Sequence, residues 1–165
     1  MRHNCQHRSP AIAPPGLIIG YGSAVRGDDY AGQAAAERIR QWRVAGARVI
    51  TQTQLTPDLA AAIARVQRVI FLDAATDRTH VEVRVIEPAL TLPSSHQSDP
   101  AALLRLTQLL YRHTPRAILI TIPAYDTSLS LALSPATERA VAYAARLARA
   151  YLGRRYWPLR TRAIG

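Results

Sequence analysis

The chain has 165 residues, 48% of them apolar, and its 21 arginines against 11 acidic residues give a net charge of +10. This length suits one domain with one core. Six arginines lie near the termini and leave about +4 on the body, so no polyanion is required and we expect no nucleic-acid partner. No apolar run reaches the ~18 residues of a membrane span, and a single cysteine, Cys5, excludes an internal disulfide. We expect a cytoplasmic protein with no membrane partner.

Breaker residues and charge divide the chain into three parts. Residues 1–16 are polar, then rich in alanine and proline, and end in Pro14-Pro15-Gly16, which indicates a flexible lead. Residues 17–152 alternate strand and helix signals and form one predicted domain. Residues 153–165 are a basic tail, which we expect to be solvated.

Residues 17–32 are the stretch around which the domain is predicted to be arranged. They read as an apolar strand, a turn with three glycines, and the adjacent Asp28 and Asp29 at the start of a helix. Open α/β sheets bind ligands at the carboxyl ends of their strands, which is where this turn would lie. The two aspartates also suit the positive end of a helix dipole, so a purely structural role stays open.

The later elements follow from apolar periodicity and capping signals. Helices are predicted at residues 29–44, at 56–65 after a Thr-Pro-Asp start, after Asp99-Pro100, and from Ser134-Pro135 to Gly153. Strands are predicted at residues 48–53, 68–73, 81–86 and 116–122. Residues 81–86 alternate apolar and charged, as a half-exposed edge strand does, and their closeness to the preceding strand predicts an antiparallel hairpin.

These signals predict a three-layer α/β/α sandwich. Its sheet has about five strands, mostly parallel, with one antiparallel edge strand, and about four main helices cover it. The functional surface should then lie at the carboxyl ends of the first and third strands.

Three candidate ligands fall on that surface: Asp29 after the first strand, Asp73 at the end of the third, and His96 on the following loop. Two carboxylates and an imidazole suit zinc, nickel, iron or manganese. Each also has an ordinary alternative. Asp29 can cap a helix, Asp73 can cap a turn, and His96 can be an exposed loop residue.

Other common sites are absent from the sequence. There is no Gly-x-Ser-x-Gly elbow, the third glycine of a dinucleotide fingerprint is replaced by Val25, and a chain without lysine has no P-loop.

Five motifs occur in an order typical of one family. They are Ile19-Gly20-Tyr21-Gly22-Ser23 with Arg26-Gly27-Asp28-Asp29, Gln54-Leu55-Thr56-Pro57-Asp58-Leu59, Phe71-Leu72-Asp73-Ala74, Ser95-His96, and Leu133-Ser134-Pro135. Together they resemble the nickel-iron hydrogenase maturation proteases over roughly residues 17–150.

The resemblance implies a function and a site. These endopeptidases remove a C-terminal extension from the precursor of the hydrogenase large subunit after nickel insertion, so the expected partner is that precursor. The family's metal-contacting positions fall on Asp29, Asp73 and His96, which are also the expected catalytic residues, and the nickel is expected to be presented by the substrate, with no resident organic cofactor. Water attack assisted by metal or by a carboxylate stays open. Asp28 is expected to be mainly structural.

Four departures from the family pattern stand near this site. Ser23 stands where the family usually has asparagine, and Tyr30 where it usually has glycine. Residues 123–126 stand where the family commonly has a glycine-rich stretch that contains a glutamate. Gln52 and Gln54 lie where some members carry an acid. An alternative function therefore remains: a noncatalytic module of the same fold that binds the nickel-loaded precursor as an assembly checkpoint.

Overall fold

A six-stranded sheet in the order β2-β1-β3-β5-β4-β6 forms the middle layer. The computed structural model describes residues 16–91, 99–153 and 162–163. Its strands are β1 (Gly16–Tyr21), β2 (Ala47–Gln52), β3 (Arg68–Ala75), β4 (Glu82–Ile86), β5 (Arg116–Pro123) and β6 (Arg162–Ala163). β2, β1, β3 and β5 run parallel, whereas β4 pairs antiparallel with β5 and with β6.

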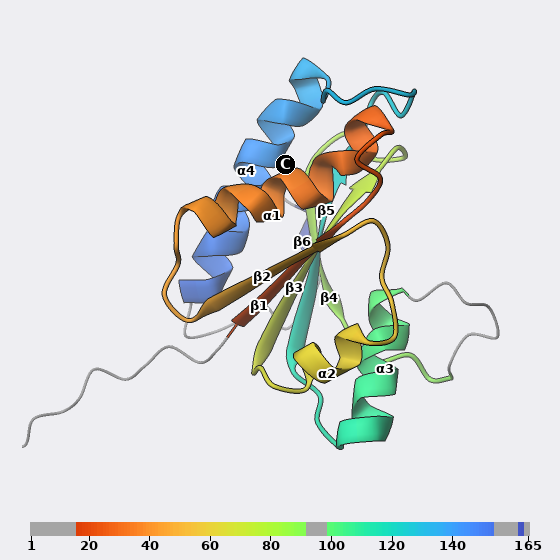
Figure 1. Ribbon diagram of the computed structural model, residues 1–165, viewed down its shortest axis with the longest axis vertical. Helices are drawn as coiled ribbons and strands as arrows, with labels where there is room; N and C mark the ends of the chain where they lie inside the picture. The colour runs from red at the N-terminus through yellow and green to blue at the C-terminus, as the bar shows by residue number, and fades with distance from the viewer. Residues whose placement is uncertain (1–15, 92–98, 154–161, 164–165) are drawn as a thin grey trace, which may run out of the picture.

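Helices cover both faces of this sheet (Figure 1). They are the short 3-10 helix η1 (Gly27–Tyr30), α1 (Ala31–Gln41), α2 (Leu59–Ile63), α3 (Pro100–Tyr111) and α4 (Pro135–Gly153). α1 and α4 lie on one face, and α2 and α3 on the other. The predicted three-layer α/β/α sandwich with a mostly parallel sheet is confirmed.

Alternation along the inner strands supplies a core on each face. In β1, Ile18 packs under α1 and α4, whereas Leu17 and Ile19 pack under α2 and α3. β3 divides in the same way, with Ile70 on the first face and Phe71 on the second. Successive side chains of a strand point to opposite faces, so a continuous apolar run is what a strand between two helical layers requires.

Capping residues set the starts of the two long helices after β4. Asp99 accepts a hydrogen bond from the Ala102 N–H (2.6 Å) just before Pro100 opens α3, and Ser134 Oγ accepts one from the Thr137 N–H (3.3 Å) at the start of α4. Both predicted caps are confirmed. The predicted start of α2 is wrong, because that helix begins at Leu59 after a turn and the Thr56 hydroxyl donates to Gln52 Oε1 instead (3.1 Å).

The predicted hairpin between the third strand and residues 81–86 is wrong. β4 pairs with β5, with Val83 opposite Ile120. Both edges of β3 are already occupied, by β1 and by an eight-residue parallel ladder with β5. Placing β3 between two parallel strands covers its apolar run fully, and the chain then passes across β5 to add β4 outside it.

The basic C-terminal segment also differs from the expected solvated tail. Its residues Arg162 and Ala163 form β6 and pair with Val83 and Glu82, so β4 is not the outermost strand at these positions. A short added strand of this kind covers part of a sheet edge. No helix in the described ranges has the length and apolar character needed to cross a membrane.

The buried carboxylate of Asp28 joins three parts of the chain at the carboxyl edge of the sheet. It has no exposed surface. Oδ1 accepts a hydrogen bond from the Ser134 N–H (2.6 Å), and Oδ2 accepts bonds from the Tyr125 N–H (2.8 Å), the Asp126 N–H (2.9 Å) and the hydroxyls of Ser134 and Thr137 (2.8 Å each). Burial disfavours the charge, but these donors outweigh it and lower the pKa of Asp28 to about 2.

Backbone hydrogen bonds reinforce the same junction. The Gly27 N–H donates to Ser130 O (2.9 Å), the Asp28 N–H to Asp126 O (2.8 Å), and the Ser130 N–H to Val25 O (3.1 Å). The turn after β1 and the loop after β5 are therefore held side by side. Asp28 has the mainly structural role expected for it.

Replacing Asp28 should destabilise the protein strongly. In Asp28→Asn an amide N–H₂ meets donors that need an acceptor, so we expect the free energy of unfolding at neutral pH to fall by about 3 kcal/mol. The folded pKa lies below that of the unfolded chain, so about 2 kcal/mol of stability is present above about pH 4 and is lost as the pH falls through about 2. Urea denaturation across this range measures both effects.

Asp77→Asn is the matched control for this measurement. Asp77 is exposed and, within the part of the chain that the structure describes, its side chain pairs only with the neighbouring Arg78 (3.0 Å), so its replacement should change stability by less than about 0.5 kcal/mol. Equal effects of the two substitutions would contradict the role given to Asp28.

Candidate functional site

The ends of β1 and β3 bring Tyr21 and Asp73 together on the face covered by α2 and α3. Gly20 pairs with Leu72 in the parallel ladder, so the next residues, Tyr21 and Asp73, are neighbours. The Tyr21 hydroxyl donates a hydrogen bond to Asp73 Oδ2 (2.9 Å). This bond fixes the orientation of the Asp73 carboxylate at the carboxyl edge of the sheet.

Asp29 approaches the same edge from the turn after β1. Its Oδ2 accepts a hydrogen bond from the Ser23 N–H (2.7 Å). Gly22 makes this turn possible, because it has φ +131° and a Cβ there would lie 1.9 Å from Asp29 O. Asp29 also lies near enough to Asp73 for its charge to raise the pKa of that residue.

Helix α1 starts directly against the two strand ends. A Cβ on Gly32 would lie 2.3 Å from Leu72 O and 2.4 Å from Tyr21 O. Only glycine allows the backbone of the helix to approach β1 and β3 this closely. The close approach sets the distance between the turn that carries Asp29 and the strand that carries Asp73.

The Asp73 carboxylate has a high proton affinity for an aspartate. Burial raises its pKa, the hydrogen bonds from Tyr21 and the Ala74 N–H oppose this, and the charge of Asp29 raises it further, to about 6. Burial and the neighbouring Asp73 charge also raise the pKa of Tyr21, so Tyr21 stays protonated and acts as a donor. Carboxylates with raised pKa values are common where protons or metals are handled.

The predicted ligand set is only partly within the described residues. Asp29 and Asp73 come together, whereas His96 lies outside the described residues, in the segment that leads to α3. Among residues 16–91, 99–153 and 162–163, no three histidine, cysteine, aspartate or glutamate side chains gather as a metal site would require. The triad therefore stays a prediction, of which the structure describes two members.

No family model and no curated protein matches the sequence. Solved structures do match the fold. The hydrogenase maturation protease HycI from Thermococcus kodakarensis has a TM-score of 0.66 and 23% identity, covering 85% of this chain and 93% of its own. HybD from the same organism has a TM-score of 0.65 and 21% identity, over 82% and 97% of the two chains.

A third match, the hydrogenase maturating endopeptidase HybD from E. coli, has a TM-score of 0.64 and 14% identity and covers 81% of this chain and 89% of its own. The chain has the hydrogenase maturation protease fold. The fold implied by the ordered motifs is thus confirmed over most of the chain, and it places Asp29 and Asp73 at the edge of the sheet.

At two of the positions that depart from the family pattern, the residues contribute to this fold through their backbone N–H groups. Ser23 holds Asp29 through its N–H, a contact that any residue except proline can make at this position. Tyr125 and Asp126 likewise hold Asp28 through their N–H groups. The side chains that differ from the family are therefore free to vary without loosening either aspartate.

The sequence analysis did not predict the contact of Tyr21 with Asp73, nor an apolar rim formed by exposed side chains on the loops after β1 and β5. The alternation Leu17, Ile19, Tyr21 predicts that Tyr21 shares a face with Asp73, so that signal was available. The rim consists of the exposed Val25, Tyr125, Leu129 and Leu131, which are 52%, 55%, 87% and 85% exposed. These residues lie on the two loops joined through Asp28, so only their pairing in space reveals the rim.

Asp73 should titrate near pH 6 in the metal-free protein. Tyr21→Phe removes a hydrogen bond that favours the ionised carboxylate, so the pKa of Asp73 should rise above that of the wild type. Carbon-13 NMR of the aspartate carboxyl groups measures the pKa. Tyr143→Phe, on the exposed side of α4, should leave it unchanged, and an Asp73 pKa near 4 in the wild type would contradict the description of the site.

The same raised pKa predicts a fall in stability with rising pH. The folded protein holds the Asp73 proton more tightly than the unfolded chain does, so this stabilising effect is complete below about pH 4 and is lost as the pH rises through about 6. Urea denaturation should show the free energy of unfolding decreasing across this window. Asp73→Asn should abolish that decrease. If the decrease persists in the variant, another titrating group causes it.

Proposed function

We propose that this protein is an endopeptidase that removes the C-terminal extension from the nickel-loaded precursor of a nickel-iron hydrogenase large subunit. The observation that supports this most strongly is the pairing of Asp29 and Asp73 at the carboxyl edge of β1 and β3, within a hydrogenase maturation protease fold. Both residues also belong to the ordered motifs that resemble the family.

In this proposal the nickel ion is part of the substrate. Asp29 and Asp73, together with His96, contact the nickel that the precursor already holds. Carboxylate oxygens and an imidazole nitrogen are suitable donors for it, and a small set of ligands can complete the coordination of an incoming ion without holding one tightly alone. The Ser23 N–H and the Tyr21 hydroxyl keep the two carboxylates in fixed orientations.

Cleavage adds one water to one peptide bond. The water oxygen attacks the carbonyl carbon, the C–N bond breaks, and a proton passes to the leaving amine. Asp73 is the candidate base in a carboxylate-assisted route, because a pKa of about 6 leaves it mostly ionised at neutral pH yet able to accept a proton. In a metal-assisted route the ion of the substrate activates the water.

The proposal is tested by incubating the purified protein with nickel-loaded precursor and measuring the mass of the precursor. Wild-type protein should release the C-terminal peptide. Asp29→Asn, Asp73→Asn and His96→Ala should each slow release by about 100-fold or more, whereas Asp77→Asn should cleave at the wild-type rate. Nickel-free precursor should stay intact.

A complex between wild-type protein and nickel-loaded precursor that forms without any cleavage would contradict the proposal. That outcome would instead support the noncatalytic checkpoint module.

A further inference from the structure

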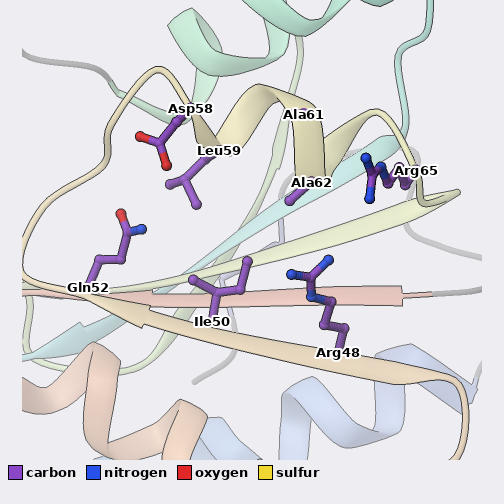
Figure 2. Close-up of a pocket in the computed structure, with 8 residues that line it drawn as sticks. All are labelled: Arg48, Ile50, Gln52, Asp58, Leu59, Ala61, Ala62 and Arg65. Atoms are coloured by element: carbon purple, nitrogen blue, oxygen red, sulfur yellow. The ribbon is translucent and has the colours of Figure 1, made fainter.

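A groove of about 260 Å³ lies between β2 and α2, on the same face of the sheet as Tyr21 and Asp73 (Figure 2). β2 is the outermost strand on this side of the described sheet. The lining residues are Arg48, Ile50 and Gln52 from β2, and Asp58, Leu59, Ala61, Ala62 and Arg65 from in and around α2.

Two arginines face each other at one end of the groove. Figure 2 shows the guanidinium groups of Arg48 and Arg65 entering from opposite walls. Neither guanidinium group makes a hydrogen bond or ion pair with any residue that the structure describes. Two unpaired cations across one gap repel each other and favour an anion between them, and a guanidinium group matches a carboxylate well.

The middle of the groove is apolar and its other end is polar. Ile50 and Ala62 pack against the core cluster that contains Leu59. Gln52 and Asp58 stand at the opposite end from the arginines (Figure 2). A ligand that fills the groove therefore needs a carboxylate at one end and an apolar part beyond it.

The polar end of the groove adjoins the candidate site. Gln52 pairs with Tyr21 in the parallel ladder, and the Tyr21 hydroxyl contacts Asp73. Arg48 lies four residues back along β2, a span of about 13 Å at the ~3.3 Å rise of a strand. An extended peptide of about four residues covers this distance.

We propose that the groove binds an extended segment of the polypeptide that the protein cleaves, with an acidic side chain of that segment held between Arg48 and Arg65. The identity of this polypeptide as the substrate rests on the proposed function, whereas the charge preference rests on the groove alone. The acidic residue lies at least about four residues from the bond that is cleaved, because the span from Arg48 ends at Gln52 and Asp73 lies two strands further across the sheet. The charge of about +4 on the body of the chain, without the terminal arginines, also favours an acidic partner.

The test uses the full-length protein and a fluorescein-labelled peptide of alternating valine and serine that ends in two glutamates. Fluorescence anisotropy at low ionic strength measures its affinity. The matched peptide that ends in two glutamines should bind at least about tenfold more weakly. Arg48→Glu and Arg65→Glu should each weaken binding of the glutamate peptide by about tenfold or more.

Arg146→Glu is the matched control, because it makes the same charge change at an exposed position of α4 on the opposite face of the sheet. It should change the affinity by less than about twofold. Equal binding of the two peptides, or an equal loss with Arg146→Glu, would overturn the proposal. So would displacement of the peptide by a single-stranded oligonucleotide at lower concentrations than unlabelled peptide requires, which would assign the groove to nucleic acid.

The outcome separates this inference from the proposed function. If the wild type fails to cleave the precursor but shows the dependence on Arg48 and Arg65, the protease function fails and the acidic-peptide groove stands. If the precursor is cleaved, and Arg48→Glu and Arg65→Glu cleave it with unchanged KM, the groove proposal fails and the protease function stands.

Discussion

A buried carboxylate that pairs with no cation among the described residues organises the carboxyl edge of this sheet. Asp28 keeps its charge only because N–H and O–H donors from the loop after β5 and the first turn of α4 converge on it. If any of these donors moved away, the buried charge of Asp28 would lose a hydrogen bond that compensates for its lost hydration. The turn after β1, the loop after β5 and α4 are therefore fixed relative to one another, and with them Asp29, the next residue along the chain.

Asp28 and Asp73 lie in opposite environments, and these give the two aspartates different roles. Asp28 is surrounded by donors and its pKa falls to about 2, so its charge is satisfied and unavailable for chemistry. Burial disfavours the ionised form of Asp73, which accepts fewer hydrogen bonds, and the charge of Asp29 lies nearby, so the pKa of Asp73 rises to about 6. A carboxylate of the second kind can exchange a proton or bind a metal near neutral pH, and one of the first kind stabilises a fold.

Local chemistry in the sequence predicts most of the elements, and the resemblance to the family predicts the separate roles of Asp28 and Asp29. Apolar runs identify β1, β3 and β5, and Asp99 and Ser134 mark the starts of α3 and α4, because these signals act over a few residues. The pairing of β4 with β5 is different: it depends on which sheet edges remain free once β3 is enclosed. Three other features likewise bring together residues that are distant in sequence: the strand β6, the apolar rim, and the pair formed by Arg48 and Arg65. Hydrophobic periodicity does not predict contacts of this kind.

Hydrogen–deuterium exchange of Asp28→Asn beside the wild type tests most directly whether this one carboxylate holds the candidate site together. We expect the amides of residues 22–30 and 124–134 to exchange much faster in the variant, while the amides of the buried ladder between β1 and β3 keep their protection. Unchanged exchange in both loops would show that Asp28 does not hold them, and the position of Asp29 would need another explanation.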